Sequence, residues 1–355
     1  GSQHATFVSD TVVAGILPGM SGIEYRSYRS GDEQQILETF NLTFAEVCGE
    51  DFEPRSLARW YWQYRDNPAG RRIMLGIAPD GRVACQYAGV PIRIWCSRGG
   101  GTELSFFHAV DSMVHPEFRT GLRRRGPFLE VAERFFDTYG GKVDALGFGY
   151  PVRDAWRIGE RFLGYRLIHP LEFLLRAVGG TGAASEVEVQ RIERFPVEVD
   201  ALFRELREHF DCTTVKDAAY LNWRYAGCPD QDYRMLWAER RGEASGFAVL
   251  RAKGNLVPDA ACLGELLVDP RDHATLAALV GEADRIAAEA GQDRLMTVQN
   301  PGLPCFATLE SLGFERRPSS TWLERKLGSR DFTSGLDQDW LDRHWAYALG
   351  DSDLF

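Results

Sequence analysis

Hydrophobic and polar positions along this chain predict one order of elements that occurs twice. Residues 23–29 and 187–195 alternate between apolar and polar side chains, as half-buried strands do. Each is followed by a stretch with apolar residues at i, i+3 and i+4, at 32–44 and 197–210, which predicts an amphipathic helix. A hairpin, a long strand, a helix, a short apolar strand, a second helix and a closing strand are then expected in each half.

The later elements are expected at matching places in the two halves. In the first half they lie at residues 74–78, 82–94, 105–114, 128–139 and 145–150, before a helix that ends near 164. In the second half they lie at residues 234–239, 244–250, a strand up to 268, 274–290 and 294–298, before a helix that ends near 313. The tripeptides at 79–81 and 241–243 both contain glycine and suit hairpin turns.

Short motifs recur in the same order and support an internal duplication. The pairs are Trp62-Gln63-Tyr64 with Trp223-Arg224-Tyr225, Val114-His115-Pro116 with Val268-Asp269-Pro270, and Leu163-Gly164-Tyr165 with Leu312-Gly313-Phe314. The offset between partners shrinks along the chain, so the second copy has shorter loops.

The repeat predicts two domains. They are expected at residues 23–178 and 187–328, joined by a linker at 179–186 that is rich in Gly, Ala and Ser. Residues 1–22 are interpreted as an N-terminal extension that begins with a tag-like sequence. Residues 329–355 form a tail with several aromatic side chains, which we expect to pack on the body.

Composition narrows the class of protein. The chain has 355 residues, 44% of them hydrophobic and 26% charged, as is typical of a soluble globular protein. Its net charge of −10 argues against a general nucleic-acid or anionic-membrane binder. Its seven cysteines are scattered and show no metal-binding spacing, so we expect reduced thiols, a cytoplasmic location and no metal. No apolar run approaches the roughly 18 residues of a membrane span.

A Gly- and Arg-containing loop is the best candidate for chemistry. It runs from Arg119 through Arg123, Arg124 and Arg125 to Gly126, directly before the helix expected at 128–139. Unpaired backbone N–H groups and positive charge at a helix start favour a phosphate or pyrophosphate. A solvated surplus of positive charge is the alternative explanation, but the position before an amphipathic helix favours ligand binding.

The order of elements, with Val-x-Pro before the Gly loop and Leu-Gly-Tyr/Phe after a helix, resembles the GNAT acyltransferase superfamily. The resemblance covers nearly the whole chain as two tandem copies. It implies an α/β fold in which each domain has a mostly antiparallel sheet, flanked by helices, whose two central parallel strands splay apart. The family's Arg/Gln-x-x-Gly-x-Gly/Ala pattern is matched from Arg123 to Phe128, with Phe at the last place and a loop about four residues longer than usual.

The resemblance also implies a cofactor, acetyl-CoA or another acyl-CoA. Its pyrophosphate would lie on the N–H groups around Arg124, Gly126, Pro127 and Phe128. Pantetheine would lie between strands 107–114 and 146–150, facing the backbone near three residues. These residues are Ser112, Met113 and Val114.

The second copy lacks this loop. After Val268-Asp269-Pro270 it has no glycine, and the carboxylates of Asp269 and Asp272 would repel a phosphate. We therefore expect only the first half to bind CoA, and the second half to be a degenerate partner that helps to shape the acceptor site.

Two residues on the long strand are candidates for the base that deprotonates an attacking amine. Asp111 lies three residues before Val114, and Glu265 holds the equivalent place before Val268. His108 is a good base near neutral pH. His108 and Asp111 have opposite parity, so at most one faces the acceptor unless a bulge intervenes.

The family's usual acid is missing. Many members have a Tyr four residues before the Gly of the Gly-Tyr/Phe pair, where this chain has Glu160 and Leu309. Tyr150 and Tyr165 are possible substitutes, and release of the thiolate to solvent is a further possibility. The Trp62 and Trp223 motifs occur in both halves, so we interpret them as core anchors.

The sequence thus predicts a cytoplasmic N-acyltransferase, in its simplest form an acetyltransferase. Its acceptor would be a small-molecule amine, with neither nucleic acid nor membrane as a partner. Two alternatives stay open: an aminoacyl-tRNA-dependent peptide-bond-forming enzyme of the Fem type, and a CoA-binding scaffold without catalysis. The acceptor, the acyl length and the oligomeric state are not determined by the sequence.

Overall fold

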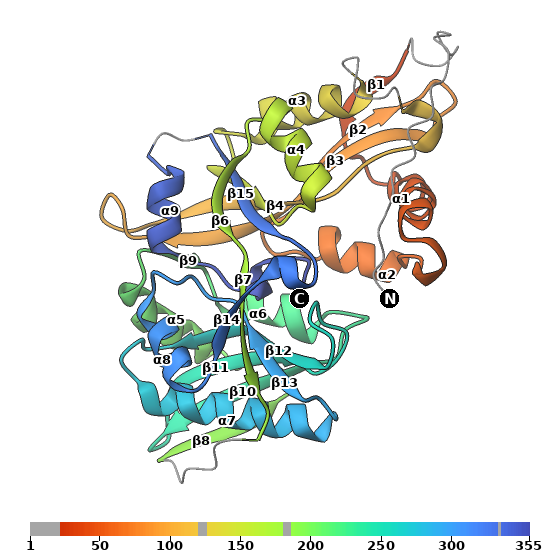
Figure 1. Cartoon of the computed structure of the whole chain (residues 1–355). Coiled ribbons are helices and arrows are strands. Elements are labelled where there is room, and N and C mark those ends of the chain that lie inside the picture. Colours follow the sequence, from red (N-terminus) through yellow and green to blue (C-terminus); the bar gives the residue numbers. More distant parts are fainter. Residues whose placement is uncertain (1–21, 120–125, 180–185, 333–334) are drawn as a thin grey trace. The chain divides into compact units, whose positions relative to one another are not determined.

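A computed structural model describes residues 22–119, 126–179, 186–332 and 335–355. Its first half contains β1 (Glu24–Ser27), α1 (Glu33–Cys48), α2 (Leu57–Trp60), β2 (Arg72–Ile77), β3 (Val83–Cys96), β4 (Thr102–Val114), α3 (Pro127–Tyr139), β5 (Leu146–Gly149), α4 (Arg153–Phe162), β6 (Arg166–Pro170) and β7 (Glu172–Ala177). The second half contains β8 (Val187–Ile192), α5 (Val199–Leu206), β9 (Cys212–Thr214), α6 (Ala218–Leu221), β10 (Tyr233–Arg240), β11 (Glu243–Arg251), β12 (Ala260–Val268), α7 (His273–Glu289), β13 (Arg294–Thr297), α8 (Pro304–Ser311), β14 (Glu315–Pro318), β15 (Lys326–Asp331), α9 (Gln338–His344) and β16 (Trp345–Ala346). The repeated order of elements expected from the sequence is therefore present (Figure 1).

The chain forms two compact units that do not coincide with its two halves. Among the described residues, unit 1 contains residues 22–61, 72–89, 109–119 and 126–139, and unit 2 contains residues 62–71, 90–108, 140–179, 186–332 and 335–355. Strands β3 and β4 contribute residues to both units. The domain boundaries drawn from the repeat stay a prediction, and the expected extension (1–21) and most of the linker (180–185) lie outside the described residues.

Unit 1 contains a small antiparallel sheet with helix α3 packed on it. Strand β1 pairs with β2, and β2 pairs with the first part of β3. Helix α3 packs on β2 through its apolar face. The ring of Tyr87 on β3 lies 4.8 Å from that of Phe135 and 5.1 Å from that of Phe136, so aromatic contacts fasten the helix to the sheet.

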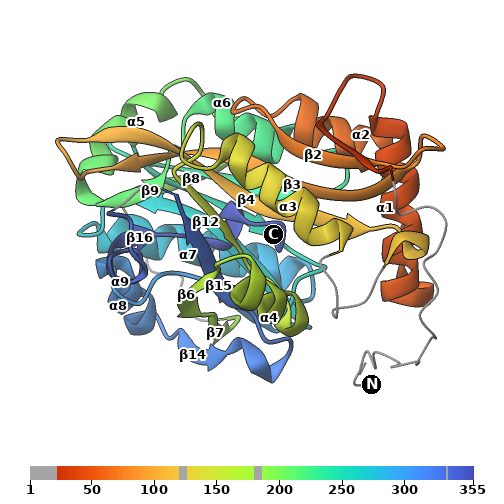
Figure 2. The same cartoon turned by 90° about the horizontal axis from the view of Figure 1, so that it is seen from above.

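Unit 2 contains a second sheet of seven strands in the order β14-β7-β13-β12-β11-β10-β8. Along β11, Phe247 and Val249 belong to one core cluster, while Ala248 and Leu250 belong to the other. Both faces of this strand are therefore buried. Helix α7 packs on strands β8, β10, β11, β12 and β13 (Figures 1 and 2).

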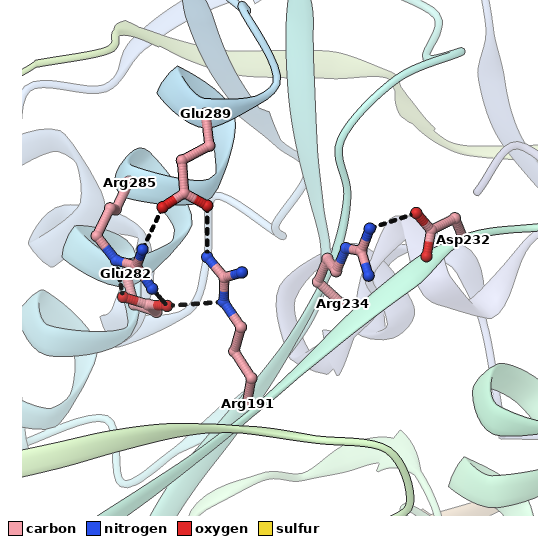
Figure 3. A network of polar contacts seen from close by, with 6 residues as sticks. All are labelled: Arg191, Asp232, Arg234, Glu282, Arg285 and Glu289. Atoms are coloured by element: carbon pink, nitrogen blue, oxygen red, sulfur yellow. Dashed lines mark hydrogen bonds and ion pairs between the residues drawn. The ribbon is translucent and has the colours of Figure 1, made fainter.

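An exposed network of ion pairs also links α7 to β8 (Figure 3). Arg191 on β8 contacts Glu282 at 3.1 Å and Glu289 at 2.9 Å, and Arg285 pairs with the same two carboxylates from the helix itself. Such solvent-exposed pairs contribute little to stability. The apolar face of the helix therefore dominates its attachment.

The two halves exchange strands near their ends, which the sequence pattern did not predict. Strand β7, from the first half, pairs with β13 and β14 in the second sheet. Strand β15, from the second half, pairs with β5 and β6 of the first half, and Figure 2 shows it beside β6. Each half therefore completes the sheet of the other.

The expected splayed parallel pair occurs in both halves. Strand β4 runs parallel to β5 from Phe106 to His108, and β12 runs parallel to β13 from Ala260 to Leu263. The other pairings in the second sheet are antiparallel. The mixed α/β fold expected from the sequence is confirmed.

Candidate functional site

His108 marks the point in unit 2 where the pairing of β4 with β5 ends. It is the last β4 residue paired with β5, opposite Phe148. Its side chain is buried, and its ring stacks on that of Phe148 at a centroid distance of 5.1 Å. The ring of Tyr150 lies 6.1 Å away. Two of the candidate proton-transfer residues are therefore neighbours at the end of the parallel pair.

Tyr150 is a buried phenol. Its hydroxyl has no hydrogen-bond partner among the residues that the structure describes. Burial raises the pKa of Tyr150 well above its ordinary value, and the carboxylate of Asp351 adds to the rise. The hydroxyl therefore keeps its proton at neutral pH and is available as a donor.

Charged groups complete this cluster in unit 2. A carboxylate oxygen of Asp353 lies 3.4 Å from Nε2 of His108. The Nε and Nη1 atoms of Arg325 are buried and have no hydrogen-bond partner within the described part of the chain. Burial lowers the pKa of Arg325, against the effect of Asp353. Neither Asp353 nor Arg325 was predictable from the sequence, because both are isolated in segments without a recognisable motif.

Asp111, the other candidate base, belongs to unit 1. Its backbone has a left-handed φ of 54°, which is unusual for a residue other than glycine and breaks the alternation of β4. Its carboxylate forms an ion pair with Arg55, and its carbonyl oxygen accepts a hydrogen bond from Gln86 at 2.9 Å. The parity argument against His108 and Asp111 facing one side therefore does not apply to this strand.

The second half repeats the ion pair of Asp111. Glu265, the equivalent residue on β12, lies 3.1 Å from Nζ of Lys216. Lys216 precedes Trp223 by as many residues as Arg55 precedes Trp62. Because the pair recurs in the half that lacks the phosphate loop, it is best explained as a structural element of each repeat.

Glu265 and Lys216 are both fully buried. Burial raises the pKa of Glu265, although Lys216 opposes the rise. Burial disfavours the charge on Lys216, but the carboxylates of Glu265 and Asp351 outweigh it and raise the pKa of the amine. Tyr225 and the backbone N–H of Leu266 each donate a hydrogen bond to Glu265 at 3.1 Å.

The predicted phosphate loop leads into α3 of unit 1. The carbonyl of Gly126 accepts from the N–H of Leu129 at 3.1 Å, which places Gly126 at the start of the helix. Pro127 follows it in the first turn, has no N–H and can donate nothing to a phosphate. Gly126 and Phe128 are thus the backbone donors available here, while Arg123, Arg124 and Arg125 lie outside the described residues.

The other predicted cofactor residues lie on β4 and just after it in unit 1. Met113 is buried, whereas Ser112 and Val114 are partly exposed. Arg119 forms an ion pair of 2.8 Å with Glu46, and its Nε lies 3.3 Å from the carbonyl oxygen of Val114. Arg119 must leave Glu46 if it is to hold a phosphate.

The corresponding helix start in the second half already holds an anion. Asp272 caps α7, accepting a hydrogen bond from the N–H of Thr275 at 3.0 Å, and it also pairs with Arg240. Burial acts to raise the pKa of Asp272, but the bonds from Thr275 and Arg240 outweigh it and lower that pKa. A carboxylate of the chain therefore takes the place that a phosphate would need.

The repeated Leu-Gly-aromatic motif caps helices. Gly164 and Gly313 have φ values of 67° and 89°, the left-handed conformation of a helix C-terminus. The ring of Tyr165 covers Gly159, where an added Cβ would lie 2.1 Å from the ring. Tyr165 is therefore in a packing position, and Glu160, at the place of the family's acid, is exposed.

The two repeated tryptophans bind each other in unit 2. The rings of Trp62 and Trp223 stack at 5.3 Å with an interplanar angle of 17°. Each indole N–H donates to the main-chain oxygen of the other residue, at 2.6 and 2.7 Å. This reciprocal contact supports the interpretation of the pair as a structural anchor.

The described residues include neither a metal-binding cluster nor a membrane-spanning helix. Nowhere in the described ranges do three or more His, Cys, Asp or Glu side chains cluster as a metal site would require. Within the same ranges, each helix is too short or too polar to traverse a lipid bilayer.

Known proteins resemble this chain in structure rather than in sequence. No family model and no curated protein matches its sequence. A GCN5-related N-acetyltransferase from Anabaena variabilis superposes with a TM-score of 0.58 at 11% identity, covering 88% of this chain and 73% of that one. Saccharomyces cerevisiae N-myristoyltransferase with bound myristoyl-CoA gives 0.54 at 12% identity, covering 91% and 87%.

A tandem GNAT protein from the clavulanic acid biosynthesis pathway gives a TM-score of 0.51 at 16% identity, covering 88% of this chain and 99% of that one. Similarity at these identities establishes a shared fold. The chain therefore has the fold of the GCN5-related N-acetyltransferases, in two tandem copies.

Proposed function

We propose that the chain is an acyl-CoA-dependent N-acyltransferase that transfers an acyl group, in the simplest case acetyl, to a small-molecule amine. The observation that carries the proposal is the pair His108 and Tyr150 at the point where the parallel strands β4 and β5 cease to pair. Support comes from the fold, which the chain shares with acyltransferases that include a myristoyl-CoA-bound enzyme. Fold alone does not define an activity, so the proposal depends on these side chains.

His108 is the general base in this proposal. An ammonium group must lose a proton before it can attack a thioester, and a neutral imidazole accepts that proton near pH 7. The amine nitrogen then forms a bond to the acyl carbon and loses its second proton to solvent, the carbon–sulfur bond breaks, and CoA leaves as a thiolate that takes up a proton from solvent. Burial of His108 beside Phe148 holds the ring in one orientation for this step.

Tyr150 acts as a hydrogen-bond donor rather than as a full acid. A thiol ordinarily has a pKa of about 8.5, and the pKa of Tyr150 lies well above the ordinary tyrosine value. Complete proton transfer from Tyr150 to a thiolate is therefore unfavourable. A hydrogen bond from its unpartnered hydroxyl still stabilises negative charge on the carbonyl oxygen or the leaving sulfur.

The start of α3 supplies the cofactor site in this proposal. Gly126 and Phe128 offer backbone N–H groups at the positive end of a 13-residue helix, which suits a diphosphate. In this proposal Ser112 to Val114 contact pantetheine, and the positive charge of Arg119 attracts the phosphates together with the arginines at 123–125, which lie outside the described residues. The second half takes no CoA, because Asp272 caps α7.

Release of free CoA tests the proposal. Purified protein is incubated with acetyl-CoA and longer acyl-CoAs, with and without pooled small amines, and free thiol is measured. We expect amine-dependent release that survives RNase treatment, and a fall in kcat on the order of 100-fold in His108→Gln and 10-fold in Tyr150→Phe. RNase-sensitive transfer would favour the aminoacyl-tRNA alternative. CoA binding without release from any acyl-CoA would favour a scaffold.

A further inference from the structure

Arg325 lies at the end of the sheet where β4 and β5 separate, and the proposed reaction gives it no role. Pairing of β15 with β5 ends at Gly328, opposite Gly149. Because the two strands are antiparallel, Tyr150 and the residues before Gly328 lie past the same end of this pairing. Arg325 directly precedes Lys326, the first residue of β15. Strand register therefore places Arg325 and Tyr150 at one end of the sheet in unit 2.

The backbone of Arg325 is held in one position. Its N–H donates to Oγ of Ser319 at 3.1 Å, and the same hydroxyl donates to its carbonyl oxygen at 3.3 Å. The N–H of Leu171 also donates to this carbonyl, at 3.0 Å. Leu327, two residues further on, is buried in the core cluster that contains Tyr150. Alternation therefore puts the side chain of Arg325 on the same side of the chain as this cluster.

The guanidinium of Arg325 has hydrogen-bonding capacity that the protein does not use. Its Nε and Nη1 atoms are buried, and neither has a hydrogen-bond partner in the part of the chain that the structure describes. A buried donor of a charged group without a partner costs free energy, because it has lost its hydration and gained nothing in return. A bound anion would remove this cost.

The carboxylate of Asp353 is the common neighbour of these side chains. It lies 3.4 Å from Nε2 of His108, and its charge affects the pKa of Arg325 and the pKa of Tyr150. The side chain of Asp353 is 58% exposed, so solvent reaches the cluster there. A ligand that arrives from solvent therefore meets a carboxylate and a guanidinium close to the buried imidazole.

We propose that Arg325 binds a carboxylate of the acceptor, and that the acceptors of this enzyme are amino acids or similar amines that carry a carboxylate. This inference rests on the proposed function. An amino acid bears a carboxylate and an ammonium group a few atoms apart. The carboxylate accepts hydrogen bonds from Arg325, and the ammonium lies toward Asp353 and the base His108. The bonds made and broken are those of the proposed acyl transfer, and the product is an N-acyl amino acid.

Such a site distinguishes acceptors by what an incorrect acceptor leaves unpaired. An amine without a carboxylate leaves Nε and Nη1 of Arg325 buried and without partners, whereas a carboxylate accepts charge-assisted hydrogen bonds from them. A site built around a polar group of its substrate rejects analogues that lack the group more strongly than an apolar pocket rejects a missing methylene. The phosphates of CoA offer similar chemistry, so the experiment must distinguish them from the acceptor.

Matched acceptors test the inference in the full chain. Each common amino acid is compared with its own amide, for example leucine with leucinamide, and release of free CoA from acetyl-CoA and longer acyl-CoAs is measured. We expect kcat/KM to be about 10- to 100-fold higher for the preferred amino acids than for their amides. The amide is the weaker base and supplies more neutral amine near pH 7, so intrinsic reactivity would favour the amide instead.

Variants of Arg325 test which residue causes the preference. Arg325→Gln should lower kcat/KM for amino acids by about 10- to 100-fold, mainly through the KM of the acceptor, and should leave the amides within threefold. Arg325→Lys keeps the charge but not the planar donor group, and should recover part of the preference. Since a loss of folded protein lowers both acceptor classes equally, their ratio reports binding rather than stability.

Arg234→Gln is the matched control, because it removes the same charge from an exposed arginine on β10. Arg234 pairs with Asp232 at 2.6 Å, away from any role in the proposed reaction (Figure 3). This variant should change neither the activity with amino acids nor the ratio between amino acids and amides.

The outcomes separate the inference from the proposed function. If the wild type releases CoA with no amine of either class, the proposed function fails and the inference fails with it. If the wild type is active but uses amino acids and amides equally, or if Arg325→Gln keeps the preference, the carboxylate site is refuted while the proposed function stands. The inference is also refuted if Arg325→Gln raises the KM for acetyl-CoA instead of the KM for the acceptor, because Arg325 then binds the cofactor. An equal loss with both acceptor classes would make Arg325 only a counter-charge for Asp353.

Discussion

Replacing Lys216 by Met should expose how much the buried ion pair of the second half contributes to stability. Nζ of Lys216 lies 3.1 Å from Glu265, and both side chains are almost completely excluded from solvent. Methionine fills a similar volume but removes the only cation of the pair. Glu265 then keeps two donors, Tyr225 and the N–H of Leu266, and no counter-charge.

Lys216→Met should lower the free energy of unfolding by about 3–5 kcal/mol at pH 8, as is usual when one partner of a buried ion pair is removed. It should depend on pH, because burial already raises the pKa of Glu265 and removal of Lys216 raises it further. A carboxyl whose pKa is higher in the folded than in the unfolded state destabilises the fold as pH rises. Between an unfolded pKa of about 4.3 and the raised pKa of the folded state, the slope is at most about 1.4 kcal/mol per pH unit. From pH 8 to pH 5 the loss should therefore shrink by up to about 4 kcal/mol, leaving about 1 kcal/mol or less at pH 5.

Urea unfolding at pH 5 and pH 8 measures both values. Arg285→Met is the matched control, because Arg285 pairs with two glutamates in the exposed network of Figure 3. Arg285→Met should lower the free energy of unfolding by at most about 1 kcal/mol at either pH. Adding Glu265→Gln to Lys216→Met should restore most of the stability and abolish the pH dependence. An equal loss at both pH values for Lys216→Met would refute the reasoning.

Three further predictions concern the candidate site and the repeat. Gly126→Glu should abolish CoA binding in calorimetry without changing the circular dichroism spectrum. Thr138→Glu, which adds the same charge at the other end of α3, should leave CoA binding intact. Retained affinity for CoA in Gly126→Glu would contradict the phosphate site. Asp111→Asn should lower the free energy of unfolding by about 1–3 kcal/mol, because it breaks a partly buried ion pair, and should change kcat less than His108→Gln does; the reverse order would make Asp111 the base. A double-mutant cycle in which Trp62 and Trp223 are each replaced by Leu should give a coupling of about 1–2 kcal/mol, and an additive result would show that their stacking and reciprocal hydrogen bonds are not cooperative.

The order of elements was predictable because it depends on local patterns. Alternation and helical spacing indicate which side chains face a core. The recurring motifs allowed the elements predicted in one half to be compared with those predicted in the other. The exchange of β7 and β15 was not predictable, because alternation does not specify which sheet edge a strand joins. Short β9, with three residues, was missed because a run of that length carries no period.

The candidate site was only partly accessible from the sequence. His108 and Tyr150 were found because each lies on a predicted strand and carries a group that can transfer a proton. Asp353 was not found, since its contact with His108 depends on the path of a segment far away in the chain. The ion pairs of Asp111 and Glu265 did leave a signal: a basic residue stands the same distance before each repeated tryptophan.

Strand exchange has a consequence for how this protein can be taken apart. A fragment that ends after β7 would carry β5 and β6 without the strand that lies between them, and β7 without its partners. The complementary fragment would carry β15 without its partners β5 and β6, and its strands β13 and β14 would lack β7, which pairs with both. Each fragment alone exposes unpaired strand edges that favour aggregation, whereas the two fragments together can pair these edges with each other. Cutting the chain between the two halves would thus yield two fragments suited to a complementation assay, in which recovery of the assay signal shows that the fragments have reassembled.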